Sequence, residues 1–156
     1  MQINTKISEC VAVLAAIDPA SIAAGTVTSA WVSVTNFLSM MLVVHTGVLG
    51  ASATIDAKIQ QAQDASGTGA KDVTGKSITQ IVKATGDNKQ ALLDLRAQDL
   101  DAANSFSHVR ISLTVGASAS IVGAVLYGGN ARNAPARDAS ANPPINLGAA
   151  SVVSIS

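Results

Sequence analysis

A glycine- and lysine-rich stretch is the part of the chain that comes nearest to a nucleotide-binding motif. It reads GAKDVTGKS over residues 69–77. A phosphate-binding P-loop has four residues between its first glycine and its Gly-Lys-Ser, because successive backbone N–H groups wrap one phosphate. This stretch has five, and it follows the polar run of residues 60–64 rather than a buried strand. It therefore predicts a solvated hairpin loop and no nucleotide site.

The residues best able to ligate a metal or to act as a nucleophile are Cys10, His45 and His108. They lie far apart in the sequence and lack the short spacing of zinc ligands. We expect Cys10 to be a small buried hydrophobic residue, and the histidines to be packed or surface residues. A catalytic pair of Cys10 with either histidine stays open, although no local signature supports it. The sequence thus predicts no metal site and no cofactor.

Serine and aspartate side chains offer no better constellation for catalysis. The stretch GASAS, residues 116–120, lacks the glycine two residues after Ser118 that a nucleophile elbow requires. Asp56, Asp94 and Asp99 would have to approach one another to do acid–base chemistry. Carboxylates on exposed strands are more often there for solubility. We therefore expect no catalytic residue, and predict that the protein is not an enzyme.

Charge and composition argue against nucleic acid and membrane as partners. The chain has 10 basic and 10 acidic residues, a formal net charge of zero, and only one Trp, one Tyr and two Phe. A nucleic-acid surface needs a basic patch interleaved with aromatic residues. Residues 19–55 and 111–131 carry no charge, but a membrane-spanning helix needs about 20 predominantly apolar residues in a row. Ser, Thr, Asn and Gly interrupt both stretches, which favours strands.

Alternation of apolar and polar residues predicts several β-strands. In residues 54–60, Ile55, Ala57 and Ile59 face one side of a strand whose other side is wet. Residues 37–46 are nearly all apolar, as in a strand buried on both faces. Residues 109–115 alternate cleanly, and a turn at residues 116–118 would let residues 121–127 return as a partner strand. The further candidates are residues 31–34 and 78–82.

The region from Asp87 to Ala103 fits two interpretations. Leu93, Ala97 and Leu100 have helical spacing, and a capping box at its start would support a helix. The same region also alternates, with charged residues between the leucines. We favour a strand that runs into a helical turn near residues 98–102.

These strands and the turn signals between them predict an all-β fold, an antiparallel β-sandwich or jelly roll with extended N- and C-terminal arms. We expect an N-terminal arm over residues 1–25, the sandwich over residues 26–130 and an extended C-terminal arm over residues 131–156. The last segment contains three of the four prolines and much Ala, Ser and Asn. Such a composition cannot bury a core of its own.

Residues 26–132 resemble small structural proteins of tailed bacteriophages that are encoded beside the head genes. The resemblance rests on TIDAKIQQAQDASGTGAKDVTGKSITQI, on ALLDLRAQDL and on HVRISLTVGASASIVGAVLYGGNAR. The order of these segments is similar to that in the family. A strand with one face exposed to water is followed by a variable polar loop, an alternating strand containing arginine, and a closing strand that ends in GGNAR.

The resemblance implies a virion protein, most like a capsid decoration (cement) protein, which binds the assembled capsid and reinforces it. Its expected partners are the major capsid protein and further copies of itself, as a trimer or dimer. It is expected on the capsid exterior, after assembly in the cytoplasm of the bacterial host. Only 13% of the residues are charged and the mean hydropathy is +0.37, which suits a chain whose apolar surface is covered by partners.

The alternative is a tail, neck or fibre component in which the sandwich binds a receptor or a glycan. Glycan sites usually present aromatic platforms. The aromatic residues available for one are Trp31, Phe37, Phe106 and Tyr127.

Overall fold

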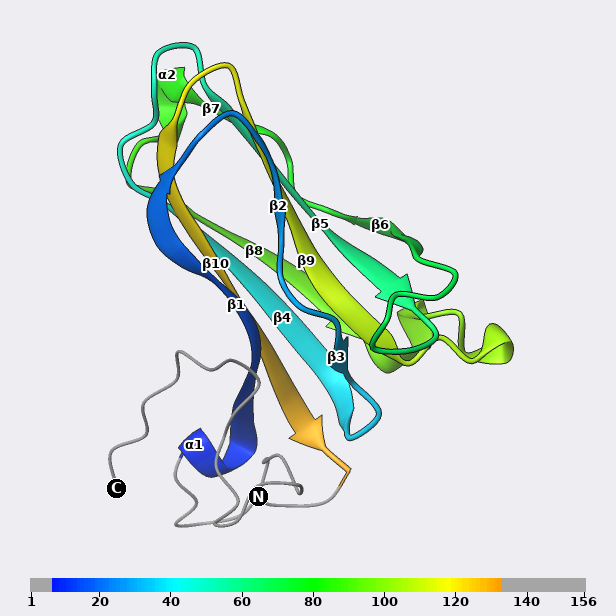
Figure 1. Ribbon diagram of the computed structural model, residues 1–156. Helices are drawn as coiled ribbons and strands as arrows, with labels where there is room; N and C mark the ends of the chain where they lie inside the picture. Colours follow the sequence, from blue (N-terminus) through cyan, green and yellow to red (C-terminus); the bar gives the residue numbers. More distant parts are fainter. Residues whose placement is uncertain (1–6, 133–156) are drawn as a thin grey trace.

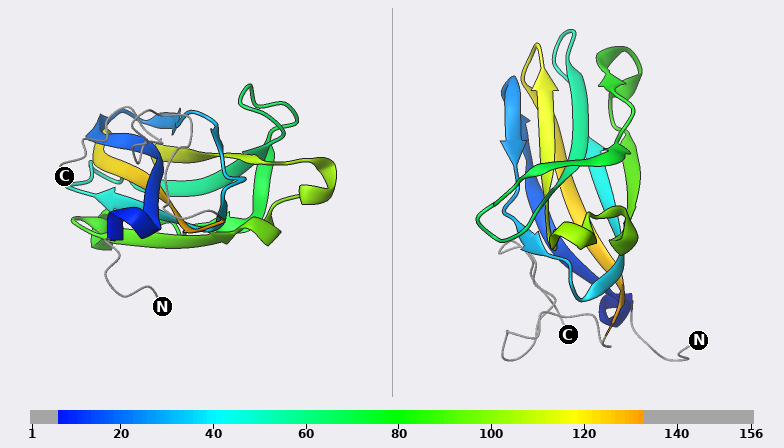
Figure 2. Two further views of the ribbon diagram at one scale, coloured as in Figure 1. Left: turned by 90° about the horizontal axis from the view of Figure 1, so that it is seen from below. Right: turned by 90° about the vertical axis from the view of Figure 1, so that its right-hand side faces the viewer.

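In the computed structural model, the chain folds into two antiparallel β-sheets that pack face to face (Figure 1), and seen from below they form two layers (Figure 2). The structure describes residues 7–132. The four-stranded sheet has the order β1 (Val11–Ile22), β10 (Ser120–Ala131), β4 (Phe37–Thr46) and β8 (Gln90–Arg96). The six-stranded sheet contains β2 (Gly25–Thr28), β9 (His108–Gly116), β5 (Thr54–Ala62) and β6 (Lys71–Ser77), with β3 (Val32–Ser33) on β9 and β7 (Ile81–Val82) on β5.

The eight longer strands pair as one long hairpin folded over on itself. β1 pairs with β10, β2 with β9, β4 with β8, and β5 with β6. Successive members of this set mostly lie in opposite sheets, which gives the strand order of a jelly roll. The prediction of an all-β, antiparallel sandwich of jelly-roll type is confirmed.

The core lies between the two sheets and is almost entirely aliphatic. The inward-facing residues of the central strands are completely buried, among them Leu42, Ile59, Ile111 and Leu126. Each large aliphatic side chain removed from water in this way contributes about 1.5–3 kcal/mol. The inward set predicted for residues 54–60 is confirmed, because Ile55, Ala57 and Ile59 are all buried.

The expected N-terminal arm is a strand over most of its length, so the boundary placed after residue 25 is wrong. Residues 11–22 form β1, which pairs with β10 from Val11 to Ile22. Two register shifts, near Val13 and near Pro19, break the period-two pattern and hide the strand in the sequence. Pro19 is tolerated because β1 is an edge strand. The expected C-terminal arm lies outside the described residues from residue 133 onward.

Strands β9 and β10 do not pair with each other, so the expected hairpin is also wrong. β9 lies in the six-stranded sheet and β10 in the four-stranded sheet. The chain crosses between the sheets at Ala117, whose φ is +65°. Alternation shows which side chains share a face of a strand, but it does not identify the neighbouring strand.

The remaining expectations need smaller corrections. The expected hairpin loop at residues 69–77 is largely strand β6, which forms the edge of the six-stranded sheet, and the strand expected at residues 78–82 is reduced to β7. For Asp87–Ala103 the favoured interpretation is confirmed, because β8 is followed by a 3-10 turn. The short helical segments are α1 (Ile7–Cys10), α2 (Lys83–Gly86) and the 3-10 turns Ala97–Asp99 and Ala102–Asn104.

Two adjacent glycines near the end of β10 face opposite sides of the four-stranded sheet. A Cβ atom at Gly128 would lie 2.8 Å from Cδ1 of Phe37 and 2.9 Å from Cδ1 of Leu14. A Cβ atom at Gly129 would meet only the hydroxyl of Ser39, at 3.7 Å. The core therefore requires a glycine at position 128 but not at position 129.

We expect Gly128→Ala to lower the free energy of unfolding by about 1–3 kcal/mol, because the new methyl group overpacks the core. Gly129→Ala is the matched control and should leave stability unchanged or raise it by about 0.5–1 kcal/mol, since glycine weakens a strand. Urea denaturation of both variants measures the difference. Equal effects of the two substitutions would contradict this account of the packing.

Candidate functional site

The cysteine and the two histidines lie in three separate places. Cys10 is exposed beside the start of β1, where Val11 pairs with Gly129 of β10. The exposed His45 pairs with Gly123 of β10, which is six residues before Gly129 and so far from Cys10. His108 belongs to the other sheet. The structure therefore does not assemble a Cys–His pair, and the expectation that Cys10 is buried is wrong. Within residues 7–132, no three His, Cys, Asp or Glu side chains come together as a metal site.

The lysines of the glycine-rich stretch are paired with carboxylates of the protein itself. Nζ of Lys71 lies 2.5 Å from Asp101 and 4.3 Å from the centre of the Phe106 ring. Nζ of Lys76 lies 2.9 Å from Asp99. These pairs hold edge strand β6 against the turns that follow β8, a structural use of the lysines rather than a phosphate cradle.

The candidate serine and aspartate residues are likewise used locally. Ser118 donates its hydroxyl to the carbonyl of Ala51 at 2.8 Å, and its own carbonyl accepts the hydroxyl of the buried Ser120 at 3.1 Å. Asp56 accepts the amide of Gln80 at 2.8 Å on the six-stranded sheet. Asp94 belongs to β8 of the other sheet, so the aspartates do not converge on one site.

The four aromatic residues do not form a shared platform. Phe37 and Phe106 are buried. The ring of Trp31 is covered by the guanidinium of Arg110, at 4.4 Å, while Tyr127 lies on the four-stranded sheet. Any glycan-binding surface would therefore have a single, partly covered aromatic ring on each sheet.

The outer face of the six-stranded sheet is polar. The hydroxyls of Thr26 and Thr114 lie 2.8 Å apart across β2 and β9. Nε of Arg110 donates to Gln60 at 2.9 Å, and the amide of Gln60 donates to Asp72 at 2.8 Å. This face satisfies its own polar groups and is suited to contact with water.

The middle of the outer face of the four-stranded sheet is apolar instead, and it is bordered on the same face by the exposed polar residues His45, Gln90, Asp94 and Arg96. The strand register places Val13, Tyr127 and Met41 side by side in one row, and Ala16, Val125, Val43 and Leu92 in the next. The side chain of Leu92 is 65% exposed and that of Met41 is 37% exposed. Large apolar side chains exposed on one contiguous surface mark a contact site. We call this surface the apolar face. Met41 and Leu92 are its exposed members, Val43 is covered by its neighbours, and the rest are half-buried. It consists of Val11, Val13, Ala16, Met41, Val43, Leu92, Val125 and Tyr127.

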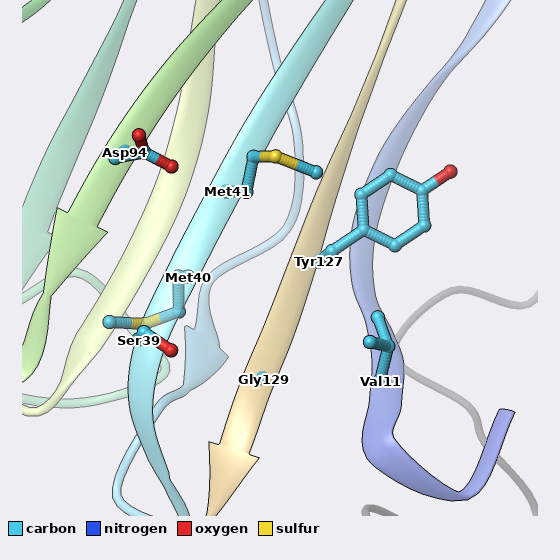
Figure 3. Close-up of a pocket in the computed structure, with 7 residues that line it drawn as sticks. All are labelled: Val11, Ser39, Met40, Met41, Asp94, Tyr127 and Gly129. Carbon is cyan, nitrogen blue, oxygen red and sulfur yellow. The ribbon is translucent and has the colours of Figure 1, made fainter. Parts of the chain in front are cut away.

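A shallow hollow of about 140 Å³ lies at one end of the apolar face, close to where β10 ends (Figure 3). It forms because Gly129, which pairs with both Val11 and Ser39, has no side chain to fill its place in the row. Met41 and Tyr127 border it, and Met41 points toward the tyrosine ring. Such a hollow is suited to receiving an apolar side chain. It is lined by Val11, Ser39, Met40, Met41, Asp94, Tyr127 and Gly129.

The apolar face is not predicted from the sequence, although the apolar run of residues 37–46 is a signal for it. That run predicts a strand buried on both faces. In the structure only the inward face is covered by the other sheet, and Met41 on the outward face is exposed. A strand that is apolar on both faces in a two-layer sandwich is therefore a sign of a further contact. No helix within the described part of the chain is long and apolar enough to cross a membrane.

One carboxylate ties together the loops at the other end of the sandwich. Asp87 accepts the N–H of Leu49 at 2.8 Å and lies 2.6 Å from Nζ of Lys83. The Lys83 ammonium, and after it the Leu49 N–H, holds the pKa of Asp87 below its ordinary value. The pKa values of four other aspartates are lowered by hydrogen bonds to lysine, threonine and amide groups; these are Asp64, Asp72, Asp99 and Asp101.

A lowered pKa in the folded state means that folding is stabilised while the carboxylate is ionised. We therefore expect stability to be fully present above the ordinary aspartate pKa of 3.8, and to fall as the pH drops through the lower folded-state values. Thermal denaturation between pH 7 and pH 2.5 measures this. The loss of thermal stability in acid should be smaller in Asp87→Asn than in the matched control Asp56→Asn. In the unchanged chain the Asp56 carboxylate accepts from the amide of Gln80. An identical acid loss in both variants would contradict a role for the Asp87 contacts.

Comparisons with known proteins do not establish a family for this chain. No known family and no curated protein matches the sequence. Among solved structures, a chain of infectious bursal disease virus, Gt strain, is similar over 80% of this chain and 33% of its own, with 11% identity and a TM-score of 0.42. This chain thus spans about a third of that protein.

A chain of the cowpea mosaic virus top component, described as naturally occurring empty particles, is similar over 86% of this chain and 94% of its own, with 7% identity and a TM-score of 0.43. The carbohydrate-binding module TmCBM61, solved with β-1,4-galactotriose, is similar over 68% of this chain and 66% of its own, with 12% identity and a TM-score of 0.36. At these TM-scores the similarities carry no argument about family or function. The jelly-roll architecture rests on the strand pairing of the chain itself, and the candidate site on its apolar face.

Proposed function

We propose that this chain is a structural protein of a phage virion, which binds the assembled capsid and reinforces it as a decoration protein. The observation that carries the proposal is the contrast between the two outer faces of the sandwich. The six-stranded sheet presents paired polar groups, whereas the four-stranded sheet presents the apolar face with Leu92 and Met41 exposed. A surface of this kind supports a role in protein contacts.

The fold alone does not select this function. Jelly rolls occur in viral capsid proteins and in lectin domains alike, and a fold hosts many functions. The sequence resemblance over residues 26–132 favours the virion role. The buried or covered rings of Phe37, Phe106 and Trp31 do not favour glycan binding.

A decoration protein works by contact and needs no catalytic group. If the chain binds the assembled shell but not its loosened form, it stabilises the shell by mass action. Many copies on one lattice add their weak contacts together. The proposed partners are the major capsid protein and further copies of this chain, as a trimer or dimer on the capsid exterior.

We expect Leu92→Lys to weaken binding to intact phage heads by about tenfold or more, because a charged side chain replaces an apolar contact. Co-sedimentation of the purified protein with intact and with empty heads measures the binding. Thr26→Lys, on the polar face of the other sheet, is the matched control and should bind as the unchanged chain does. Undiminished binding of Leu92→Lys would remove the apolar face from the proposal.

Deleting the residues after Arg132 should leave a folded domain, because the described strands of both sheets all lie within residues 11–131. We expect this truncated chain to bind heads poorly, since residues 133–156 are the part proposed to reach neighbouring subunits. Urea denaturation checks the fold and co-sedimentation checks the binding. Binding at full strength would show that the C-terminal segment is not needed for attachment.

A further inference from the structure

The described part of the chain ends beside the hollow of the apolar face. β10 ends at Ala131, and the N–H of Arg132 donates to the carbonyl of Asn36 at 2.8 Å, which fixes the point of departure. Gly129, whose missing side chain creates the hollow, lies three residues before Arg132. The rest of the chain therefore starts next to the hollow, at the end of the four-stranded sheet.

The residues that follow have the composition of an apolar ligand. Residues 139–156 contain no Lys, Arg, Asp or Glu. A segment without charges would leave no ionised group unpaired on an apolar surface. Its apolar side chains include β-branched residues, which suit an extended segment lying on a sheet. These side chains are Ile145, Leu147, Val152, Val153 and Ile155.

We propose that residues 145–155 of one copy of this chain lie on the apolar face of a neighbouring copy, with an aliphatic side chain in the hollow beside Gly129. The inference rests on the proposed role of this face in contacts between subunits, and it names the occupant of the face. Each copy then gives one segment and receives one, so that the contacts can close into a symmetric oligomer.

The connecting residues favour a neighbouring copy over the same chain. Residues 133–144 contain Pro135, Pro143 and Pro144, which disfavour helical conformations at themselves and at the residues before them. β10 runs toward the end of the four-stranded sheet at Ala131. To reach its own apolar face, the chain would have to reverse direction within residues 133–144, whereas the face of a neighbouring copy can be reached without a reversal.

Site-directed cross-linking tests the occupant in the free protein, without any capsid. One form of the full chain carries Cys10→Ser and Met41→Cys, and the other carries Cys10→Ser and Val153→Cys. The two forms are mixed at equal concentration with a short thiol cross-linker, and the yield of mixed dimer is measured. The control replaces Met41→Cys with Thr26→Cys. We expect a roughly tenfold higher yield with Met41→Cys, because docking raises the local concentration of the Val153→Cys thiol at the apolar face. Thr26 lies on the outer face of the other sheet and is exposed.

A second variant tests the hollow. Adding Gly129→Leu to the Met41→Cys form should fill the hollow and reduce the mixed dimer to the Thr26→Cys level. Thermal denaturation of this form, and the reaction of its introduced thiol with a small maleimide, should stay unchanged. The substitution is tolerated because a Cβ at Gly129 meets only Ser39, at 3.7 Å.

Three results would overturn the inference. The first is equal cross-linking from the Met41→Cys and Thr26→Cys forms. The second is a chain with both Met41→Cys and Val153→Cys that links only within itself, which would assign the face to its own C-terminal segment. The third is a mixed dimer that survives Gly129→Leu. Since no capsid is present, these results are separate from the co-sedimentation test, so that a failure of this inference is distinguishable from a failure of the proposed function.

Discussion

The pairing of β10 with both β1 and β4 is the interaction on which the rest of the structure depends. β10 is the last strand of the described chain, and it lies between β1, the first strand, and β4. It therefore joins the two ends of the described chain. Its inward residues Val122, Ala124 and Leu126 are buried in the core. Its outward residues Val125 and Tyr127 form the middle of the apolar face. One strand therefore both closes the sandwich and builds the surface that we assign to contacts.

This double role limits which residues β10 can hold. At position 128 the ring of Phe37 and the side chain of Leu14 occupy the space of a side chain, so the core selects glycine. At position 129 the space is open on the other side of the sheet. A glycine there serves no packing need of the described fold, but it leaves the hollow. The core explains the first glycine, and a partner's side chain would explain the second.

The sequence was sufficient to predict which segments are strands wherever alternation is unbroken. Alternation predicts the inward residues of β5 and β9, and it favours a strand at β8 although the residues there also have helical spacing. It does not predict β1, because the register shifts place Ala12, Leu14 and Ala15 all in the core, which period two does not allow. It also cannot predict the pairing of β9 with β5 rather than β10, because alternation contains no information about neighbouring strands.

The candidate site was harder to predict because it differs from the core only in what covers it. Met41 and Leu42 are adjacent apolar residues of β4, yet Leu42 is buried against the other sheet, whereas Met41 faces outward beside Tyr127 and is 37% exposed. In sequence they look alike. A two-layer sandwich covers each of its sheets on one side, so a strand that is apolar on both sides has more apolar surface than its own fold can bury. The low charge content of the chain and its apolar face therefore have the same origin, and we propose that a second protein surface covers this sheet.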